Sequence, residues 1–230
     1  MKKQPAPPAP RAVLFDAYGT LFDVYSVALL GEQLFPGFGE RLALLWRDKQ
    51  IEYTRLTSMS GRYQPFWELT RAGLRFATQR LGLTLGVADE DRLMNQYRHL
   101  SSFPENREVL AELKARGIPA GILSNGDPDM LGAAVESAGF AGLLAHVISV
   151  HALRKFKTDP ATYALGTQAF GLPAHAILFV SSNGWDAIGA TWAGYTTLWV
   201  NRAGLPLEPL GTAPTRTGTS LRDVLDFFPS

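Results

Sequence analysis

Short apolar runs that alternate with helical intervals are the feature that most constrains the fold of this chain. The runs are rich in β-branched and aromatic residues and are bounded by Gly, Pro, Asn or Asp. They are Ala12–Phe15, Ile118–Leu123, Ile177–Val180 and Thr197–Val200, with a weaker one at His146–Val150. The later runs are separated by helical patterns of roughly 10–15 residues, the spacing of βα units. This predicts an α/β fold with a Rossmann-like parallel sheet.

Helix boundary signals agree with this pattern. Asp127-Pro128 and Asp159-Pro160 each place a candidate N-cap aspartate before a first-turn proline. Gly139 and Gly171 stand where the two helices that follow are expected to end.

The interval after the first strand predicts a second domain. From Tyr25 to about Leu100 the apolar residues recur at helical spacing, with few strand-like runs. We therefore expect residues 11–22 and 102–230 to form the α/β core, with a helical cap inserted at 23–101. The proline-rich residues 1–10 predict a flexible tail. The Pro-, Gly- and Thr-rich stretch 203–219 predicts a long loop before a last short helix at 221–227.

Composition excludes several function classes. Lys+Arg 22 against Asp+Glu 21 gives a formal net charge of +1, too small for a basic field that binds nucleic acid. The absence of cysteine excludes disulfides, thiolate nucleophiles and cysteine metal ligands. No apolar signal or membrane segment stands out, so we expect a cytoplasmic protein without membrane contact. The four histidines, His99, His146, His151 and His175, lack metal-ligand spacing and have no predicted role.

Polar side chains follow the predicted strands, at the sheet edge where open α/β folds bind ligands. The segments are Asp16-Ala17-Tyr18-Gly19-Thr20, Ser124-Asn125-Gly126 and Ser181-Ser182-Asn183-Gly184-Trp185-Asp186, with Lys157 ahead of a helix. An ionised carboxylate attacks an electrophile without a general base. A nearby ammonium group favours the ionised form. Asp16 beside Lys157 is therefore a candidate nucleophile.

The order of these residues resembles the four motifs of the haloacid dehalogenase superfamily, most members of which are magnesium-dependent phosphatases. The phosphatase pattern has a second aspartate two residues after the nucleophile and an acidic residue four positions before the last aspartate. This chain has Tyr18 and Ser182 there. Because Mg²⁺ prefers carboxylate oxygens, a metal-dependent phosphatase is the weaker alternative. A catalytically silent relative that keeps the fold is a third hypothesis.

The cap segment 46–53 and the segment 181–186 resemble one branch of that superfamily, the L-2-haloacid dehalogenases, and the likeness spans about residues 11–200. It implies a cofactor-independent hydrolase that uses no metal. The expected reaction converts (S)-2-haloacids to (R)-2-hydroxy acids and halide through an aspartyl ester. Short-chain 2-haloalkanoates are the implied substrates, and acceptance of haloacetates, fluoroacetate included, stays open. The resemblance also implies a homodimer.

The resemblance implies a catalytic role for one group of side chains. Asp16 is the nucleophile, Thr20 supports its carboxylate, and Lys157 pairs with it. The remaining members hydrogen bond around Lys157 or position it and the hydrolytic water: Tyr163, Ser181, Asn183 and Asp186.

A second group is implied to bind substrate. Arg47 and Asn125 meet the halide, and Ser124 holds the substrate carboxylate together with the backbone near Tyr18. The apolar walls around the alkyl group are Tyr18, Phe66 and Trp185. The cap residues Asp48 and Arg55 receive no role.

Overall fold

Six strands form one parallel sheet in the order β3-β2-β1-β4-β5-β6. This is seen in a computed structural model that describes residues 9–229. The strands are β1 (Ala12–Phe15), β2 (Ala120–Ser124), β3 (His146–Ser149), β4 (Ile177–Ser181), β5 (Thr196–Val200) and β6 (Arg216–Gly218). The predicted α/β fold with a parallel sheet is confirmed.

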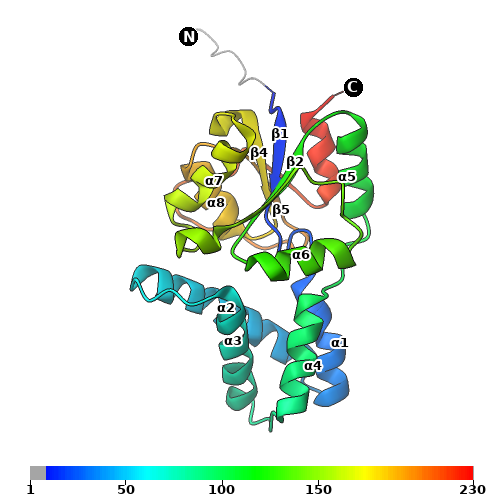
Figure 1. Cartoon of the computed structure of the whole chain (residues 1–230), viewed down its shortest axis with the longest axis vertical. Coiled ribbons are helices and arrows are strands. Elements are labelled where there is room, and N and C mark those ends of the chain that lie inside the picture. The colour runs from blue at the N-terminus through cyan, green and yellow to red at the C-terminus, as the bar shows by residue number, and fades with distance from the viewer. Residues whose placement is uncertain (1–8, 230) are drawn as a thin grey trace.

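Helices cover both faces of this sheet, as the continuous burial of β1, β2 and β4 requires. Helix α5 (Asn106–Ala115) and the 3₁₀ helix η4 (Leu221–Phe227) lie on one face, and α7 (Pro160–Phe170) and α8 (Gly184–Trp192) lie on the other (Figure 1). Helix α6 (Pro128–Ser137) follows β2. Two short 3₁₀ helices, η2 (Val150–Leu153) and η3 (Ala174–Ala176), complete the connections.

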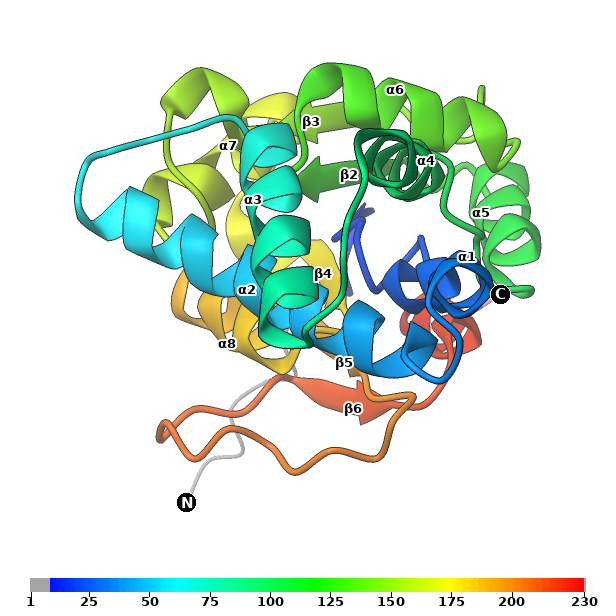
Figure 2. The same ribbon diagram turned by 90° about the horizontal axis from the view of Figure 1, so that it is seen from below.

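Four helices form a separate layer beyond the carboxyl ends of the strands (Figures 1 and 2). They are α1 (Ala28–Leu34), α2 (Gly39–Met59), α3 (Phe66–Arg80) and α4 (Val87–Arg98), preceded by the 3₁₀ helix η1 (Val24–Val27). Trp46 of α2 and Tyr97 of α4 are fully buried with ring centroids 5.1 Å apart, so the layer has its own core.

The chain leaves the sheet for this helical layer and returns from it at one place. Phe22 forms an antiparallel bridge with Ser102, and the backbone N–H of Asp23 donates to the carbonyl of Ser101 at 2.8 Å. The helical layer is therefore inserted between β1 and α5, and its two connections run side by side.

Two local expectations were wrong. The stretch 203–219 is not loop throughout, because Arg216–Gly218 forms β6. This strand has three largely exposed residues at the sheet edge, so it carries no apolar run that would predict it. Asp159 caps α7 through the N–H of Ala161, but the side chain of Asp127 does not cap its own helix, α6.

The flexible tail expected at 1–10 falls outside the described residues for positions 1–8. Within residues 9–229, no helix is both long enough and apolar enough to span a bilayer.

Close packing of α7 on β1 gives a stability prediction. A Cβ at Gly166 would overlap Leu14 Cδ2 and come within 2.6 Å of Tyr195 Oη, which is itself held by the carbonyl of Tyr163. We expect Gly166→Ala to lower the free energy of unfolding by about 1–3 kcal/mol in urea titration. The control is Gly132→Ala in α6, where a Cβ would meet no atom within 4 Å. This substitution should raise the free energy of unfolding by up to about 1 kcal/mol. An unchanged value for Gly166→Ala would show that α7 can move away from β1.

Candidate active site

The polar segments that follow β1, β2 and β4 meet where the helical layer faces the sheet. Asp16 comes directly after β1, Ser124 is the last residue of β2, and Ser181 is the last residue of β4. Lys157 lies in the loop before α7, and Arg47 enters from α2 in the helical layer. The site is thus shared between the two layers.

The carboxylate of Asp16 is held unevenly. Its Oδ2 accepts hydrogen bonds from Thr20 Oγ1 at 3.0 Å, Asn183 Nδ2 at 2.8 Å and Ser181 Oγ at 3.3 Å. Its Oδ1 accepts one from Lys157 Nζ at 3.1 Å. Three donors fix the carboxylate through Oδ2, whereas Oδ1 accepts only one, so Oδ1 keeps a free acceptor site that can face an electrophile.

Lys157 connects two buried carboxylates. Its Nζ lies 3.1 Å from Asp16 Oδ1 and 2.9 Å from Asp186 Oδ2, and all three side chains are nearly inaccessible to solvent. Burial alone would lower the pKa of Lys157, but the charges of Asp16 and Asp186 raise it above its ordinary value. The lysine therefore stays protonated.

One ammonium group cannot neutralise two buried carboxylates. Burial, opposed by the charge of Lys157, raises the pKa of Asp186 to about 6. Asp186 Oδ1 accepts a hydrogen bond from the phenol of Tyr163 at 2.7 Å, and burial keeps the pKa of that phenol well above its ordinary value. Tyr163 therefore reaches Lys157 through Asp186 and acts there as a donor.

Arg47 is a buried cation with neutral partners. Arg47 is only 6% exposed. Its guanidinium donates to Gln50 Oε1 at 2.7 Å, to the Tyr18 carbonyl at 3.0 Å and to Asn183 Oδ1 at 3.3 Å. Within the described part of the chain, Arg47 forms no salt bridge. A buried charge without a counter-charge is costly, so this arrangement favours an anionic ligand.

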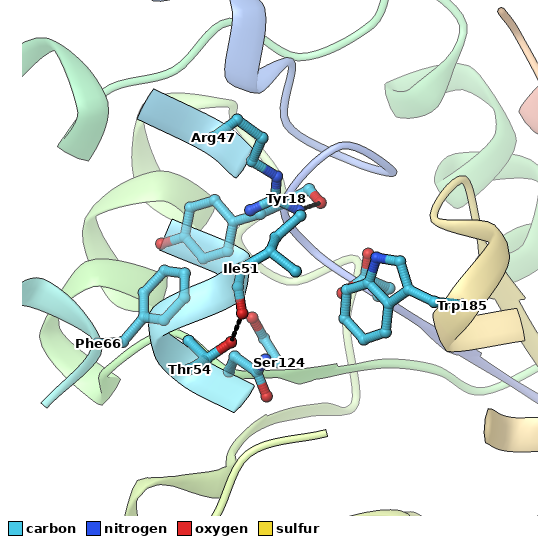
Figure 3. A pocket seen from close by; sticks show the side chains of 9 residues that line it. Tyr18, Arg47, Ile51, Thr54, Phe66, Ser124 and Trp185 are labelled. Carbon is cyan, nitrogen blue, oxygen red and sulfur yellow. Dashed lines mark hydrogen bonds between the residues drawn. The ribbon is translucent and has the colours of Figure 1, made fainter. Parts of the chain in front are cut away.

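A small pocket separates Arg47 from Asp16, with a volume of about 10 Å³. Figure 3 shows Phe66 and Trp185 on opposite sides of it, with Tyr18 and Ile51 between them. The remaining lining residues are Thr54, Ser124 and Asn125. A volume of this size admits little more than a water-sized group, so the pocket excludes large ligands.

Two lining residues keep a hydrogen-bond donor for a ligand. Ser124 Oγ accepts the backbone N–H of Gly126 at 3.1 Å, so its own proton is not used in that bond. Asn125 Oδ1 accepts the backbone N–H of Lys157 at 2.9 Å, which orients the side chain and leaves its amino group as the donor.

The residues present do not fit a magnesium site. The phosphatase pattern has acidic residues at the positions of Tyr18 and Ser182. Here the Tyr18 carbonyl accepts a hydrogen bond from Arg47, and Ser182 Oγ accepts one from Arg202 Nη1 at 2.7 Å, so an arginine already binds at each position. Among residues 9–229, no three His, Asp or Glu side chains are placed to hold a metal ion.

The structure brings all the predicted site residues together in two groups, one that lines the pocket and one that contacts the first through hydrogen bonds. The residues that line the pocket are Asp16, Tyr18, Arg47, Phe66, Ser124, Asn125 and Trp185. Those that reach it through hydrogen bonds to Asp16 or Lys157, directly or by way of Asp186, are Thr20, Lys157, Tyr163, Ser181, Asn183 and Asp186.

Gln50 was missed. It is fully buried, accepts from Arg47 and from the Tyr97 phenol at 2.9 Å, and donates to Thr70 Oγ1 at 2.6 Å. It therefore ties the arginine to α3 and α4. A signal was present, because a glutamine three residues after an arginine on a helix shares its face.

The chain is similar to known proteins both in sequence and in fold. A family model described as haloacid dehalogenase-like hydrolase matches residues 10–194. An (S)-2-haloacid dehalogenase of Pseudomonas sp. (strain YL) is 44% identical over 218 residues, covering 95% of this chain and 94% of that protein. A crystal structure of an L-2-haloacid dehalogenase is 58% identical, with a TM-score of 0.93 over 96% of this chain and 99% of that one.

A third relative carries a ligand. The L-2-haloacid dehalogenase of Xanthobacter autotrophicus, solved with chloropropionic acid covalently bound, is 36% identical. Its TM-score is 0.88, over 96% of this chain and all of that one.

The buried charges of this site give a second prediction. Lys157→Met would leave two buried carboxylates without a cation, and we expect a loss of about 3–5 kcal/mol in the free energy of unfolding at pH 8. Without the lysine charge that lowers it, the pKa of Asp186 would rise further above about 6. A raised carboxyl pKa stabilises the folded state as the pH falls, so the loss should be smaller at pH 5 than at pH 8.

The matched control is Lys155→Met, two residues away, which removes a half-exposed lysine paired with Asp159. We expect it to cost less than about 1 kcal/mol at either pH. Equal losses for Lys157→Met at pH 5 and pH 8 would contradict the charge argument.

Proposed function

Because the chain belongs to the haloacid dehalogenase-like hydrolase family, in its L-2-haloacid dehalogenase branch, we propose that Asp16 is the nucleophile with which it hydrolyses (S)-2-haloacids to (R)-2-hydroxy acids and halide. The observation that carries the proposal is the pairing of two groups on one small pocket. An aspartate held by Lys157 lines the same pocket as a buried arginine that forms no salt bridge within residues 9–229.

The first step is an in-line displacement. Asp16 Oδ1 attacks C2 of the substrate, the carbon–halogen bond breaks, and the halide leaves with the bonding electrons. C2 is inverted and becomes bonded to the aspartate as an ester. Arg47 and Asn125 stabilise the departing halide, and the loss of one preorganised donor of this kind costs about 3–4 kcal/mol of barrier.

The second step releases the product. Water attacks Cγ of Asp16, the bond between Cγ and the ester oxygen breaks, and the 2-hydroxy acid leaves with an oxygen that came from Asp16. The carboxylate is regenerated with one oxygen from water, and one proton is released. Lys157, kept in place by Asp186, neutralises the negative charge that develops on the carboxyl group.

Substrate size and charge follow from the pocket. Ser124 Oγ and the backbone near Tyr18 are positioned to hold the substrate carboxylate, and Tyr18, Phe66 and Trp185 enclose a short alkyl group. We propose that residues 23–101 act as a cap on a core of residues 11–22 and 102–230, because Arg47 and Phe66 come from the helical layer.

The covalent mechanism predicts the fate of oxygen. In a single turnover with L-2-chloropropionate in ¹⁸O-labelled water, the label should enter Asp16 and be absent from the 2-hydroxy acid, as mass spectrometry of peptide and product would show. Asp16→Asn should release no chloride while keeping the wild-type circular dichroism spectrum, since it loses the attacking anion. Label in the first-turnover product, with none in Asp16, would mean that water attacks C2 directly.

We also propose a homodimer that forms through the cap. Supporting this, α2 presents the exposed apolar side chains of Leu44, Leu56 and Met59. Light scattering after size-exclusion chromatography should give twice the chain mass of 25.1 kDa. Leu44→Glu with Met59→Glu should shift it to the monomer mass, whereas a wild-type monomer at all concentrations would contradict the proposal.

A further inference from the structure

The core holds the first turn of a cap helix through one carboxylate. Asp127, which precedes α6 in the core, accepts the backbone N–H of Phe66 on Oδ1 at 3.1 Å and that of Trp67 on Oδ2 at 2.8 Å. Phe66 and Trp67 are the first two residues of α3. Asp127 is 9% exposed, so these bonds are shielded from water.

The sequence around α3 explains why the acceptor for its first N–H groups comes from another part of the chain. The residue at the N-cap position is Pro65, which has no side-chain acceptor, so nothing in α3 satisfies its first N–H groups. In the core, α6 begins at Pro128, and the Asp127 side chain makes no hydrogen bond to that helix. It instead caps a helix that lies some sixty positions earlier in the chain.

His151 and Tyr63 complete this contact. His151 Nδ1 lies 2.9 Å from Asp127 Oδ1 and 2.9 Å from the Tyr63 hydroxyl. Nδ1 either donates to the carboxylate or accepts from the phenol, so in either tautomer His151 lies between the core carboxylate and the segment just before α3. The Tyr63 ring stacks on the ring of Phe156, with the two centroids 5.0 Å apart. Phe156 is the residue directly before Lys157.

The same contact continues to the halide side of the pocket. The Phe66 carbonyl accepts from Thr70 Oγ1 at 2.7 Å, and Thr70 Oγ1 accepts from Gln50 Nε2 at 2.6 Å. Gln50 Oε1 accepts from Arg47 at 2.7 Å. Each of these hydrogen bonds is buried. A shift of the α3 N-terminus would therefore move both Arg47 and the Phe66 ring, whose centroid lies 5.4 Å from that of the Tyr18 ring.

From these contacts we infer that Asp127 is a positioning residue for dehalogenation. It holds the cap against the core at the N-terminus of α3, and so sets the place of the Phe66 wall directly and of Arg47 through Thr70 and Gln50. The inference rests on the proposed function for its kinetic consequence, but the contact itself can be tested without any activity.

The test compares Asp127→Ala with Asp127→Asn, which keeps one acceptor oxygen. In Asp127→Ala we expect faster hydrogen exchange at the amides of Phe66 and Trp67. We also expect KM for L-2-chloropropionate to rise about tenfold, equivalent to about 1.4 kcal/mol, with a smaller change in kcat. Asp127→Asn should recover part of both effects. If Asp127→Ala does not fold, Asp127→Asn against the wild type carries the comparison.

The control is Ser220→Ala, which removes the side-chain cap of η4 within the core, a bond of 3.3 Å to the N–H of Arg222. It should leave KM and the exchange of Phe66 and Trp67 unchanged, although it removes a helix cap as well. Wild-type KM and wild-type exchange in Asp127→Ala would overturn the inference. If the wild type releases no halide from any 2-haloacid, the proposed function fails, and the exchange measurement alone decides whether Asp127 holds α3.

Discussion

The ammonium group of Lys157 lies between the carboxylates of Asp16 and Asp186 in a space that water does not reach. The arrangement of the polar side chains around Asp16 depends on this group. Without that charge, two buried carboxylates would lie close together with no cation between them, which is costly. The surrounding donors serve the same end. Thr20, Ser181 and Asn183 bind one oxygen of Asp16, and Tyr163 binds Asp186, so each carboxylate keeps its charge and orientation.

The sheet explains why these groups meet. Parallel strands bring their carboxyl ends to one edge, so residues that follow β1, β2 and β4 become neighbours although they are far apart in sequence. This regularity made Asp16, Ser124 and Asp186 predictable from strand-like runs alone. The fold class followed from the same runs. The edge strand β6 did not, because its three residues, two of them exposed, lack the apolar pattern of a buried strand.

Contacts between the layers could not be predicted from local pattern. Asp127-Pro128 has the form of a helix start, and nothing near it indicates that the carboxylate caps α3 instead. Gln50 and His151 were passed over for the same reason. A glutamine or histidine has many ordinary positions, and its role here comes from the packing of α2, α3 and η2 against their neighbours. The family resemblance supplied Arg47, which by itself resembles any charge on a helix.

The placement of the two cations explains why the enzyme needs a second layer. In an in-line displacement the nucleophile and the leaving group lie on opposite sides of the reacting carbon. A cation that steadies Asp16 therefore cannot also stabilise the halide. The sheet edge supplies Lys157 beside Asp16, and only an element facing that edge can supply a cation across the pocket. In the proposed mechanism Arg47 on α2 meets that requirement, and because it forms no salt bridge with residues 9–229, its charge remains for the anion that forms there. The reaction geometry thus requires that the cap be held in register with the core.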